Sequence, residues 1–356
     1  MRDRRKISMA CAAVLASVAA LVVIGRRPVK AQESSAAGKS GYHLIKKVNL
    51  GGEGGWDYLT ADPASRRLFI SRGTHVMVVD ADEGKVVGDI PNTQGVHGIA
   101  LVPDMNKGFT SNGKTATSTV FDMKTLQPLG EATTEKNPDA IIYDPASKRV
   151  FTFNGGSDSA TAIDAATGKA VGTIALGGGP EFAASDGKGH VFVNLEDKSQ
   201  LVKFDPLTLK VEKTWPLAPC ESPSGLAIDA EHEILVVGCH NKMMAFVDGS
   251  SGTVIGTVPI CQGVDANRFD PATGFAFASC GDGTVTVAHE DSTDKFSVVD
   301  TIQTQRGART MELDTSNHNL YLVSADFGPT PAATPEHPRP RPPIIPDTFT
   351  LLIFGR

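Results

Sequence analysis

Residues 140–176 read AIIYD-PASK-RVFTFN-GGSD-SATAIDAATG-KAVGTIAL, and they show the repeating unit of the chain most clearly. Apolar and polar side chains alternate in four short segments, which is the pattern of β-strands with one buried face. Asp-Pro and Thr-Gly pairs stand between the segments and favour tight turns. The stretch therefore predicts a unit of four antiparallel strands, at about 140–144, 149–154, 159–164 and 169–176.

The same unit recurs along the chain. Its second strand has an apolar centre seven times, with steps of 40, 42, 41, 44, 41 and 44 residues. These centres are Phe69, Phe109, Phe151, Phe192, Val236, Phe277 and Tyr321. About 40 residues for four strands is the spacing of propeller blades. We therefore predict an all-β fold, a seven-bladed β-propeller over residues 42–356.

The last unit is one strand short. Residues 309–314, 320–324 and 349–356 supply three strands (RTMELD, LYLVS and FTLLIFGR), and the chain then ends. Residues 42–50 (YHLIKKVNL) match the outer-strand pattern KAVGTIAL. We predict that this N-terminal strand pairs with the last blade, because such pairing removes open sheet edges and closes the ring.

The first 31 residues have a composition of their own. Basic residues at positions 2, 4, 5 and 6 precede an apolar run over 7–24, which is the pattern of a signal peptide. Small residues at Val29 and Ala31 favour cleavage before Gln32, and an uncleaved membrane anchor is the alternative. Residues 32–41 are then a linker, and the protein is expected in the periplasm or outside the cell.

The charge of the remaining chain disfavours two classes of partner. Residues 1–31 hold seven of the 34 Lys and Arg residues and one of the 40 Asp and Glu residues. The rest therefore has 27 basic and 39 acidic side chains, a net charge of −12. So acidic a body disfavours nucleic acid and anionic membrane surfaces as partners. We expect a monomer without membrane contact beyond the signal segment.

The repeats resemble the YVTN-type (YncE-like) β-propeller family, which is related in shape to WD-repeat propellers. The eponymous motif appears in degenerate form as LFIS, GFTS, VFTF, VFVN, LVVG, AFAS and LYLV. The resemblance covers residues 42–356 and is specific for the fold. Because members include surface-layer and periplasmic proteins without established catalysis, it implies an exported binding or scaffold role.

Seven polar residues are expected to form a ring at one mouth of the central channel. They stand where each blade's innermost strand begins, on the face that we call the top: Asp57, His97, Asp139, Glu181, Ser224, Asp265 and Arg309. Crowded carboxylates favour a bound cation or ligand. We therefore predict a ligand site at all seven, with a divalent cation held by Asp57, His97, Asp139, Glu181 and Asp265. The alternative is that these side chains cap strand ends and hold channel water.

Four cysteines remain after the signal segment and predict disulfide bonds. Cys220 and Cys239 are 19 residues apart, as are Cys261 and Cys280, and the two pairs lie one repeat apart. Pairing within each blade follows in an oxidising compartment. A cross-blade bond between Cys239 and Cys261 competes, and a tetrathiolate metal site would need all four sulfurs to converge.

Residues 325–347 are a proline-dense insertion in the last blade. Prolines enforce extended backbone, so the segment should arch over the top face or project as an arm that binds a partner, and a surface loop without a role is the alternative. Asp158, Asp197, His240 and Asp282 lie in other top-face loops, where turn formation explains most of them.

Three classes of function compete. The first is a non-catalytic exported binding or scaffold propeller, with a small molecule or a protein at its top face. The second is a metal-dependent hydrolase resembling gluconolactonase-type propellers, with Asp139 or Glu181 as general base. The third is a redox or cofactor-binding propeller, although no c-type haem motif is present.

Overall fold

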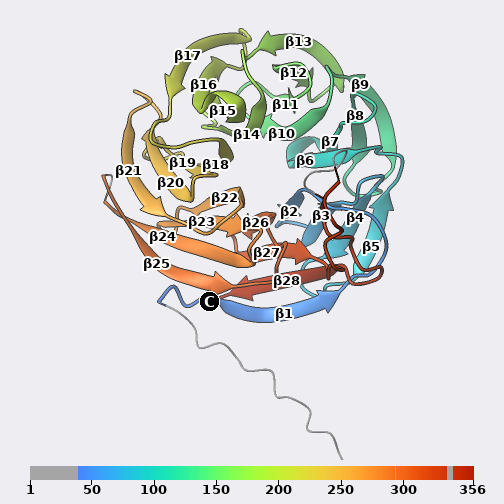
Figure 1. Ribbon diagram of the computed structural model, residues 1–356. Helices are drawn as coiled ribbons and strands as arrows, with labels where there is room; N and C mark the ends of the chain where they lie inside the picture. Colours follow the sequence, from blue (N-terminus) through green and yellow to red (C-terminus); the bar gives the residue numbers. More distant parts are fainter. Residues whose placement is uncertain (1–38, 293, 335–339) are drawn as a thin grey trace, which may run out of the picture. The chain divides into compact units, whose positions relative to one another are not determined.

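The computed structural model describes residues 39–292, 294–334 and 340–356. Their strands form seven four-stranded antiparallel sheets around a central axis (Figure 1). The prediction of an all-β, seven-bladed propeller is therefore confirmed. The predicted signal segment, residues 1–31, and residues 32–38 of the predicted linker lie outside the described residues.

Each blade runs from an innermost strand at the channel to an outer strand at the rim. The innermost strands are β2 (Leu59–Asp62), β6 (Val96–Val102), β10 (Pro138–Asp144), β14 (Pro180–Ser185), β18 (Pro223–Asp229), β22 (Val264–Asp270) and β26 (Met311–Asp314). The second strands are β3 (Arg67–Ser71), β7 (Lys107–Asn112), β11 (Arg149–Asn154), β15 (Val191–Leu195), β19 (Ile234–Cys239), β23 (Phe275–Cys280) and β27 (Asn319–Ser324).

The two outer layers complete the blades. The third strands are β4 (Val76–Asp80), β8 (Thr117–Asp122), β12 (Ser159–Asp164), β16 (Gln200–Asp205), β20 (Met243–Asp248), β24 (Thr284–Ser292) and β28 (Thr350–Gly355). The outer strands are β5 (Val86–Ile90), β9 (Pro128–Thr133), β13 (Lys169–Ala175), β17 (Lys210–Pro216), β21 (Val254–Pro259), β25 (Lys295–Gln303) and β1 (His43–Asn49). Two 3-10 turns, η1 (Pro103–Met105) and η2 (Glu196–Lys198), join strands. Among the described residues, no helix has the length and apolarity needed to cross a membrane.

The two ends of the chain close the ring as predicted. Strand β1 pairs antiparallel with β28, from His43 opposite Gly355 to Asn49 opposite Thr350. Tyr42 is buried beside this pair, and its hydroxyl donates to the backbone oxygen of His318 at 2.7 Å. The last blade is thus built from both ends of the described chain, which leaves β1 as its outer strand (Figure 1).

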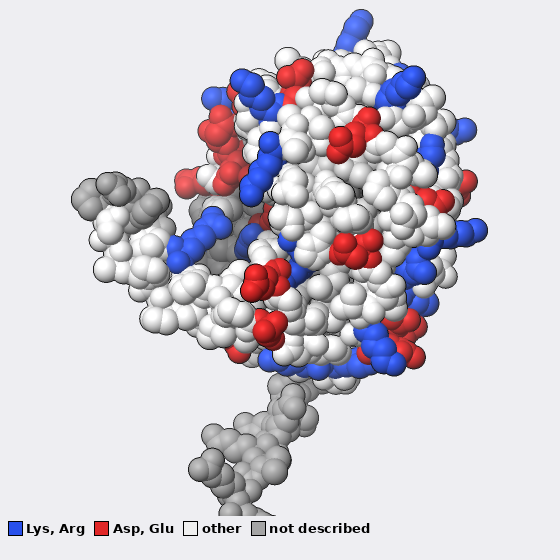
Figure 2. Space-filling view, turned by 90° about the vertical axis from the view of Figure 1, so that its right-hand side faces the viewer, with Lys and Arg blue, Asp and Glu red and all other residues white. Residues whose placement is uncertain are grey.

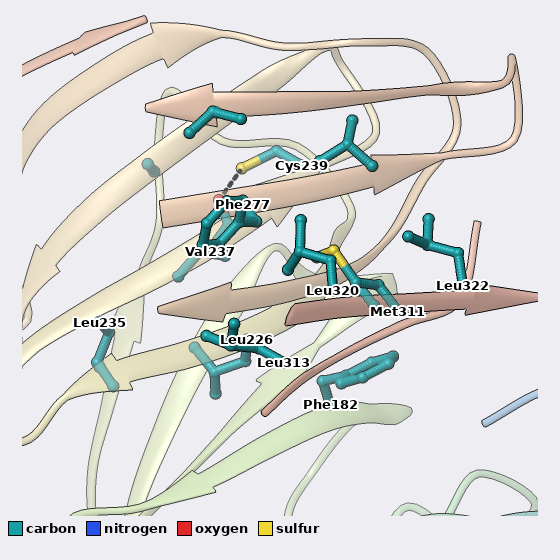
Figure 3. Packing of buried hydrophobic residues seen from close by; sticks show 14 of the residues in the cluster. Phe182, Leu226, Leu235, Val237, Cys239, Phe277, Met311, Leu313, Leu320 and Leu322 are labelled. Carbon is teal, nitrogen blue, oxygen red and sulfur yellow. Dashed lines mark hydrogen bonds between the residues drawn. The ribbon is translucent and has the colours of Figure 1, made fainter. Parts of the chain in front are cut away.

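The repeating apolar centres form the core between neighbouring blades. All seven predicted centres lie on second strands and are at most 2% exposed. Figure 3 shows one such interface, where Phe182, Leu226, Phe277 and Met311 come from different blades and meet in one cluster. Burial of this apolar surface is the main force that holds blades together.

Six blades end their innermost strand with a turn aspartate on the bottom face, the face opposite the top. We call these residues the turn aspartates: Asp62, Asp144, Asp186, Asp229, Asp270 and Asp314. Each accepts a hydrogen bond from a backbone N–H two or three residues further on. Aspartate favours turns for this reason, because its short side chain reaches the backbone just ahead. The turn aspartates therefore fix where each blade reverses direction.

Both disulfide bonds form within a blade. Cys220 is bonded to Cys239, and Cys261 to Cys280. The cross-blade bond and the tetrathiolate site are thereby excluded. Each bond ties the loop that enters an innermost strand to the end of the second strand in the same blade. The top-face loops of blades five and six are therefore held covalently.

Candidate functional site

The structure brings the seven predicted ring residues to the top mouth of the channel. Five of them are the second residue of their innermost strand, in β6, β10, β14, β18 and β22. Asp57 and Arg309 lie two residues before β2 and β26. The strand geometry is the same in each blade, so equivalent positions converge around the axis.

Five ring residues form one chain of charged contacts. Nδ1 of His97 donates to Oδ2 of Asp57 at 2.6 Å and lies 3.6 Å from Oδ1 of Asp139. Arg309 donates through Nη2 to Asp57 at 3.1 Å and through Nη1 to Asp265 at 3.3 Å. Arg309 thus offsets the charge of two carboxylates that would otherwise repel each other, and His97 supplies a hydrogen-bond donor to Asp57.

The other two ring residues have different roles. Ser224 donates its hydroxyl to the backbone oxygen of Asp265 at 3.3 Å. Glu181 has no ion-pair partner in the described part of the chain and lies near two other carboxylates. Burial raises the pKa of Glu181 to about 9, with further contributions from the charges of Asp139 and Glu196. Glu181 is therefore protonated at neutral pH.

The remaining ring groups titrate under opposing influences. Burial raises the pKa of Asp139 to about 6, against the nearby His97, and Asp57 and Asp265 add to the rise. Burial also raises the pKa of Asp265, although Arg309 opposes it. For His97, burial lowers the pKa, but the hydrogen bond to Asp57 and the charge of Asp139 outweigh it and leave a raised value.

Three of the five predicted metal ligands lie close enough to share a cation. The ligand atoms of Asp57, His97 and Asp139 are all within 4.8 Å of one another. Glu181 and Asp265 are not in this group. Both oxygens of Asp57 already accept hydrogen bonds, from His97 and Arg309. A cation at these three residues stays a prediction, and it would compete with the arginine.

A cavity lies in the channel below the ring, and it was not predicted from the sequence. Its volume is about 580 Å³ and its lining is mostly apolar. Tyr58, which follows the ring residue Asp57, lines this cavity, and the centroid of its aromatic side chain lies 4.9 Å from that of Phe182. Inside, Arg268 donates to both oxygens of Glu312, at 3.2 and 3.1 Å. Arg268 and Glu312 are charged, whereas the equivalent positions in the other five blades are not. This difference between repeats could have identified them from the sequence.

The proline-dense segment forms an arm with a fixed base on the top face. We define the arm as residues 325–347. Phe327 pairs with Ile344 as an antiparallel bridge, and Gly328 N–H donates to the backbone oxygen of Pro343 at 2.8 Å. Asp326 accepts a hydrogen bond from Nε2 of Gln305 at 3.1 Å, which attaches the base to the disc. The expectation of a projecting arm is thus met by its described part (Figure 2).

A cavity of about 560 Å³ lies between the base of the arm and the disc, and we call it the arm–disc pocket. Trp56, Phe327 and Ile344 supply apolar walls, and Arg306, Arg309 and Arg341 supply charge. Arg309 belongs to both the ring and the pocket. Sequence reasoning missed this pocket because its walls come from three blades and the arm.

Other predicted top-face residues serve the turns. Asp197 accepts a hydrogen bond from Gly179 N–H at 2.8 Å, and Asp282 accepts one from Gln262 N–H at 2.9 Å. Both bonds join a loop between second and third strands to the loop that enters the same blade. The expectation that such residues form turns holds for these two.

A further cluster of metal-ligand types lies on the bottom face. Asp229, His232 and Glu290 have ligand atoms within 4.8 Å of one another. Asp229 is a turn aspartate and accepts a 2.5 Å hydrogen bond from Nδ1 of His232. Asp186 contacts His190 in the same way, at 2.8 Å. The aspartate–histidine pair therefore recurs as part of the turn.

Comparison with known proteins supports the fold. The chain matches no protein-family model and no curated protein. A structure of the Kuenenia stuttgartiensis hydrazine synthase aligns with a TM-score of 0.66 at 18% identity, over 78% of this chain and 94% of that one. A chain of the mitotic checkpoint complex aligns at 0.71 and 12% identity, over 98% and 99%. The RRP9 WD40 repeats align at 0.71 and 10% identity, over 90% and 100%. At these identities the likeness concerns the propeller fold alone.

Proposed function

We propose that this protein is an exported, non-catalytic binding propeller of the YVTN type, which holds a ligand or a protein partner on its top face. The arm–disc pocket carries the proposal. It is a concave site of about 560 Å³ with a few charged groups among apolar walls, which is the usual make-up of a ligand site. WD40-like propellers of the same shape are compatible with a binding or scaffold role.

The ring supports a binding role over catalysis. Ser224 is the one ring residue with a hydroxyl, and it donates to a backbone oxygen rather than to His97. A serine nucleophile needs an adjacent base within hydrogen-bond reach. The polar contacts of His97 among the described residues are with the carboxylates of Asp57 and Asp139, and none is with a hydroxyl. The contacts within the ring therefore favour a binding surface of charged groups held in place by one another over a pair of nucleophile and base.

Export is supported by the disulfide bonds and by the composition of residues 1–31. Disulfides persist in oxidising compartments, and both pairs here are formed. The full chain expressed in a Gram-negative host should be recovered from the periplasm. Its intact mass should correspond to a protein whose N-terminus lies near Gln32. Recovery from the cytoplasm with residues 1–31 intact and all five cysteines as free thiols would contradict export.

Hydrogen–deuterium exchange tests the binding face. The protein is screened by thermal shift against organic anions, divalent cations, amines and short peptides, and each hit is mapped by exchange. We expect protection in the top-face segments 51–57, 281–283 and 305–309. Protection confined to the bottom-face turns, such as 229–233, would contradict the proposal, and so would turnover of a bound compound.

A second candidate is a metal-dependent hydrolase, which the spacing of Asp57, His97 and Asp139 favours. Asp139 would serve there either as the third ligand or as the general base, and not as both. In this case Ca²⁺, Mn²⁺ or Zn²⁺ would raise the melting temperature. EDTA would reverse the rise, and the double change Asp139→Asn with Glu181→Gln would abolish it. No shift with any of the three ions would dismiss this candidate.

A further inference from the structure

The arm–disc pocket has an unusual charge for this protein. Three of its lining residues are arginines, and none of the described residues that line it is acidic. Arg306 and Arg341 are exposed and have no ion pair among the described residues. The chain as a whole carries more acidic than basic side chains, 40 against 34. A local excess of guanidinium groups in an acidic protein favours an anionic ligand.

Donor groups around the pocket also lack acceptors. Arg72 is 1% exposed, and its Nε and Nη1 have no hydrogen-bond partner in the described residues. Its third nitrogen, Nη2, donates to the backbone oxygen of Glu53, beside the pocket wall. Nε1 of Trp56 is likewise buried without an acceptor. This side of the molecule is thus rich in positive and donor groups that its own acceptors do not satisfy.

Two of the apolar walls, Trp56 and Phe327, are aromatic and lie in tilted contact. The Trp56 ring lies 6.1 Å from that of Phe327 and 5.3 Å from that of Phe349, between centroids. The guanidinium of Arg72 stands 3.6 Å from the centroid of Phe349. Arg306 faces Phe327 at 6.0 Å. Aromatic rings and guanidinium planes together accept a ring-shaped apolar body that carries a negative charge.

The pocket is formed before any ligand arrives. The bridge between Phe327 and Ile344 holds the arm's base, and Asp326 joins it to Gln305 and Thr348. Gly307 has a φ of +84°, and an added Cβ would lie 2.7 Å from the Phe327 ring. The close approach of disc and arm therefore depends on glycine there. A preformed site lowers the entropic cost of binding.

We propose that the arm–disc pocket binds a small organic anion, namely a carboxylate attached to an apolar ring. This inference rests on the proposed function and specifies its ligand class. The carboxylate lies against Arg306 and Arg341, and the apolar ring packs on Trp56 and Phe327. A volume of about 560 Å³ suits such a molecule.

Titration with 4-tert-butylbenzoate tests the proposal in the variant Trp215→Phe, which leaves Trp56 as the only tryptophan of the two in the chain. Isothermal titration calorimetry measures affinity, and protection of Trp56 from acrylamide quenching reports the location. We expect saturable binding that protects Trp56. The neutral 4-tert-butylbenzamide and the ringless acetate should each bind at least about tenfold more weakly, since each lacks one of the two recognition elements.

Matched charge variants complete the test. Arg306→Gln with Arg341→Gln should weaken binding by about tenfold or more without changing the melting temperature, because both side chains are exposed. Lys210→Gln with Lys213→Gln removes two exposed charges from β17 and should leave binding unchanged. Equal affinity for benzoate and benzamide, or equal loss in both double variants, overturns the proposal. If a cation or a peptide protects the top face instead, the anion proposal fails and the proposed function stands. If no compound class protects that face, both fail.

Discussion

The innermost strands end in the same way on the bottom face and in different ways on the top face. Six blades place an aspartate at the bottom turn, and each makes the same backbone hydrogen bond. At the top, the equivalent positions carry aspartate, histidine, glutamate, serine and arginine. Comparison of the seven blades thus distinguishes residues that the blade structure requires from residues that it does not require. The residues that differ are the ones free to serve a function.

The largest effect is expected from a turn aspartate. Asp314 is 1% exposed and accepts hydrogen bonds from Ser316 and, at 2.5 Å, from Arg66. The change Asp314→Ala removes this ion pair together with two turn hydrogen bonds from Ser316, and should lower the free energy of unfolding by about 3–4 kcal/mol. Asp82 is the exposed partner of the same arginine. Asp82→Ala should cost less than about 1 kcal/mol.

Urea unfolding of the two variants provides the comparison. Equal midpoints would mean that Asp314 behaves as a solvated surface group. The turn aspartates would then not be structural, and the contrast between the two faces would not hold.

The covalent ties of blades five and six come next. Each disulfide closes a loop with a sequence separation of 19. The change Cys220→Ser with Cys239→Ser should therefore lower stability by about 3 kcal/mol, and the same change at Cys261 and Cys280 by a similar amount. Peptide mass mapping of the parent should recover the two intra-blade links and no free thiol among these four. Recovery of the Cys239–Cys261 peptide would contradict the assignment.

The repeat explains why the fold could be predicted from the sequence. A period near 40 residues places every strand end, so the closure by β1 and the convergence of the ring followed from position, whereas position left the Cys239–Cys261 bond open as an alternative to the intra-blade disulfides. The period of the repeat does not indicate which contacts form between different residue types at equivalent positions. The bridge of Arg309 between Asp57 and Asp265 depends on side-chain reach across the channel. The arm–disc pocket depends on how residues 325–334 and 340–347 fold back, and no repeat describes that segment.

Within the ring, two carboxylates should respond in opposite directions. Asp57 accepts hydrogen bonds from His97 and Arg309, so Asp57→Asn should destabilise the fold by about 1–2 kcal/mol. Glu181 has no ion pair in the described chain, and its side chain is protonated when folded. Glu181→Gln should therefore stabilise the fold at neutral pH by about 1–2 kcal/mol, since glutamine needs no proton. Destabilisation by both changes would mean that the hydrogen bond between the Glu181 carboxyl and Glu196 outweighs the cost of holding the proton.

The smallest expected effect is a difference in pH dependence between the two faces. On the bottom face, burial alone would raise the pKa values of Asp186 and Asp314, but hydrogen bonds hold both below the ordinary value. Their contribution to stability is present above the ordinary aspartate pKa and is lost as the pH falls through the lowered values. On the top face, burial raises the pKa of Glu181 to about 9.

Between about pH 5 and 9 the folded state therefore binds a proton on Glu181 that the unfolded chain has released. Stability should fall as the pH rises through this window, by less than about 1.4 kcal/mol per pH unit because Glu181 is partly exposed. The same sign holds for Asp139 and His97, so the parent is compared with Glu181→Gln by urea unfolding at each pH. The difference between the two should grow from pH 5 to pH 9, while their loss of stability below pH 4 should be equal. If the difference in the free energy of unfolding is constant across the window, Glu181 has the same pKa in the folded and unfolded chain. The folded protein would then not hold a proton on Glu181 at neutral pH.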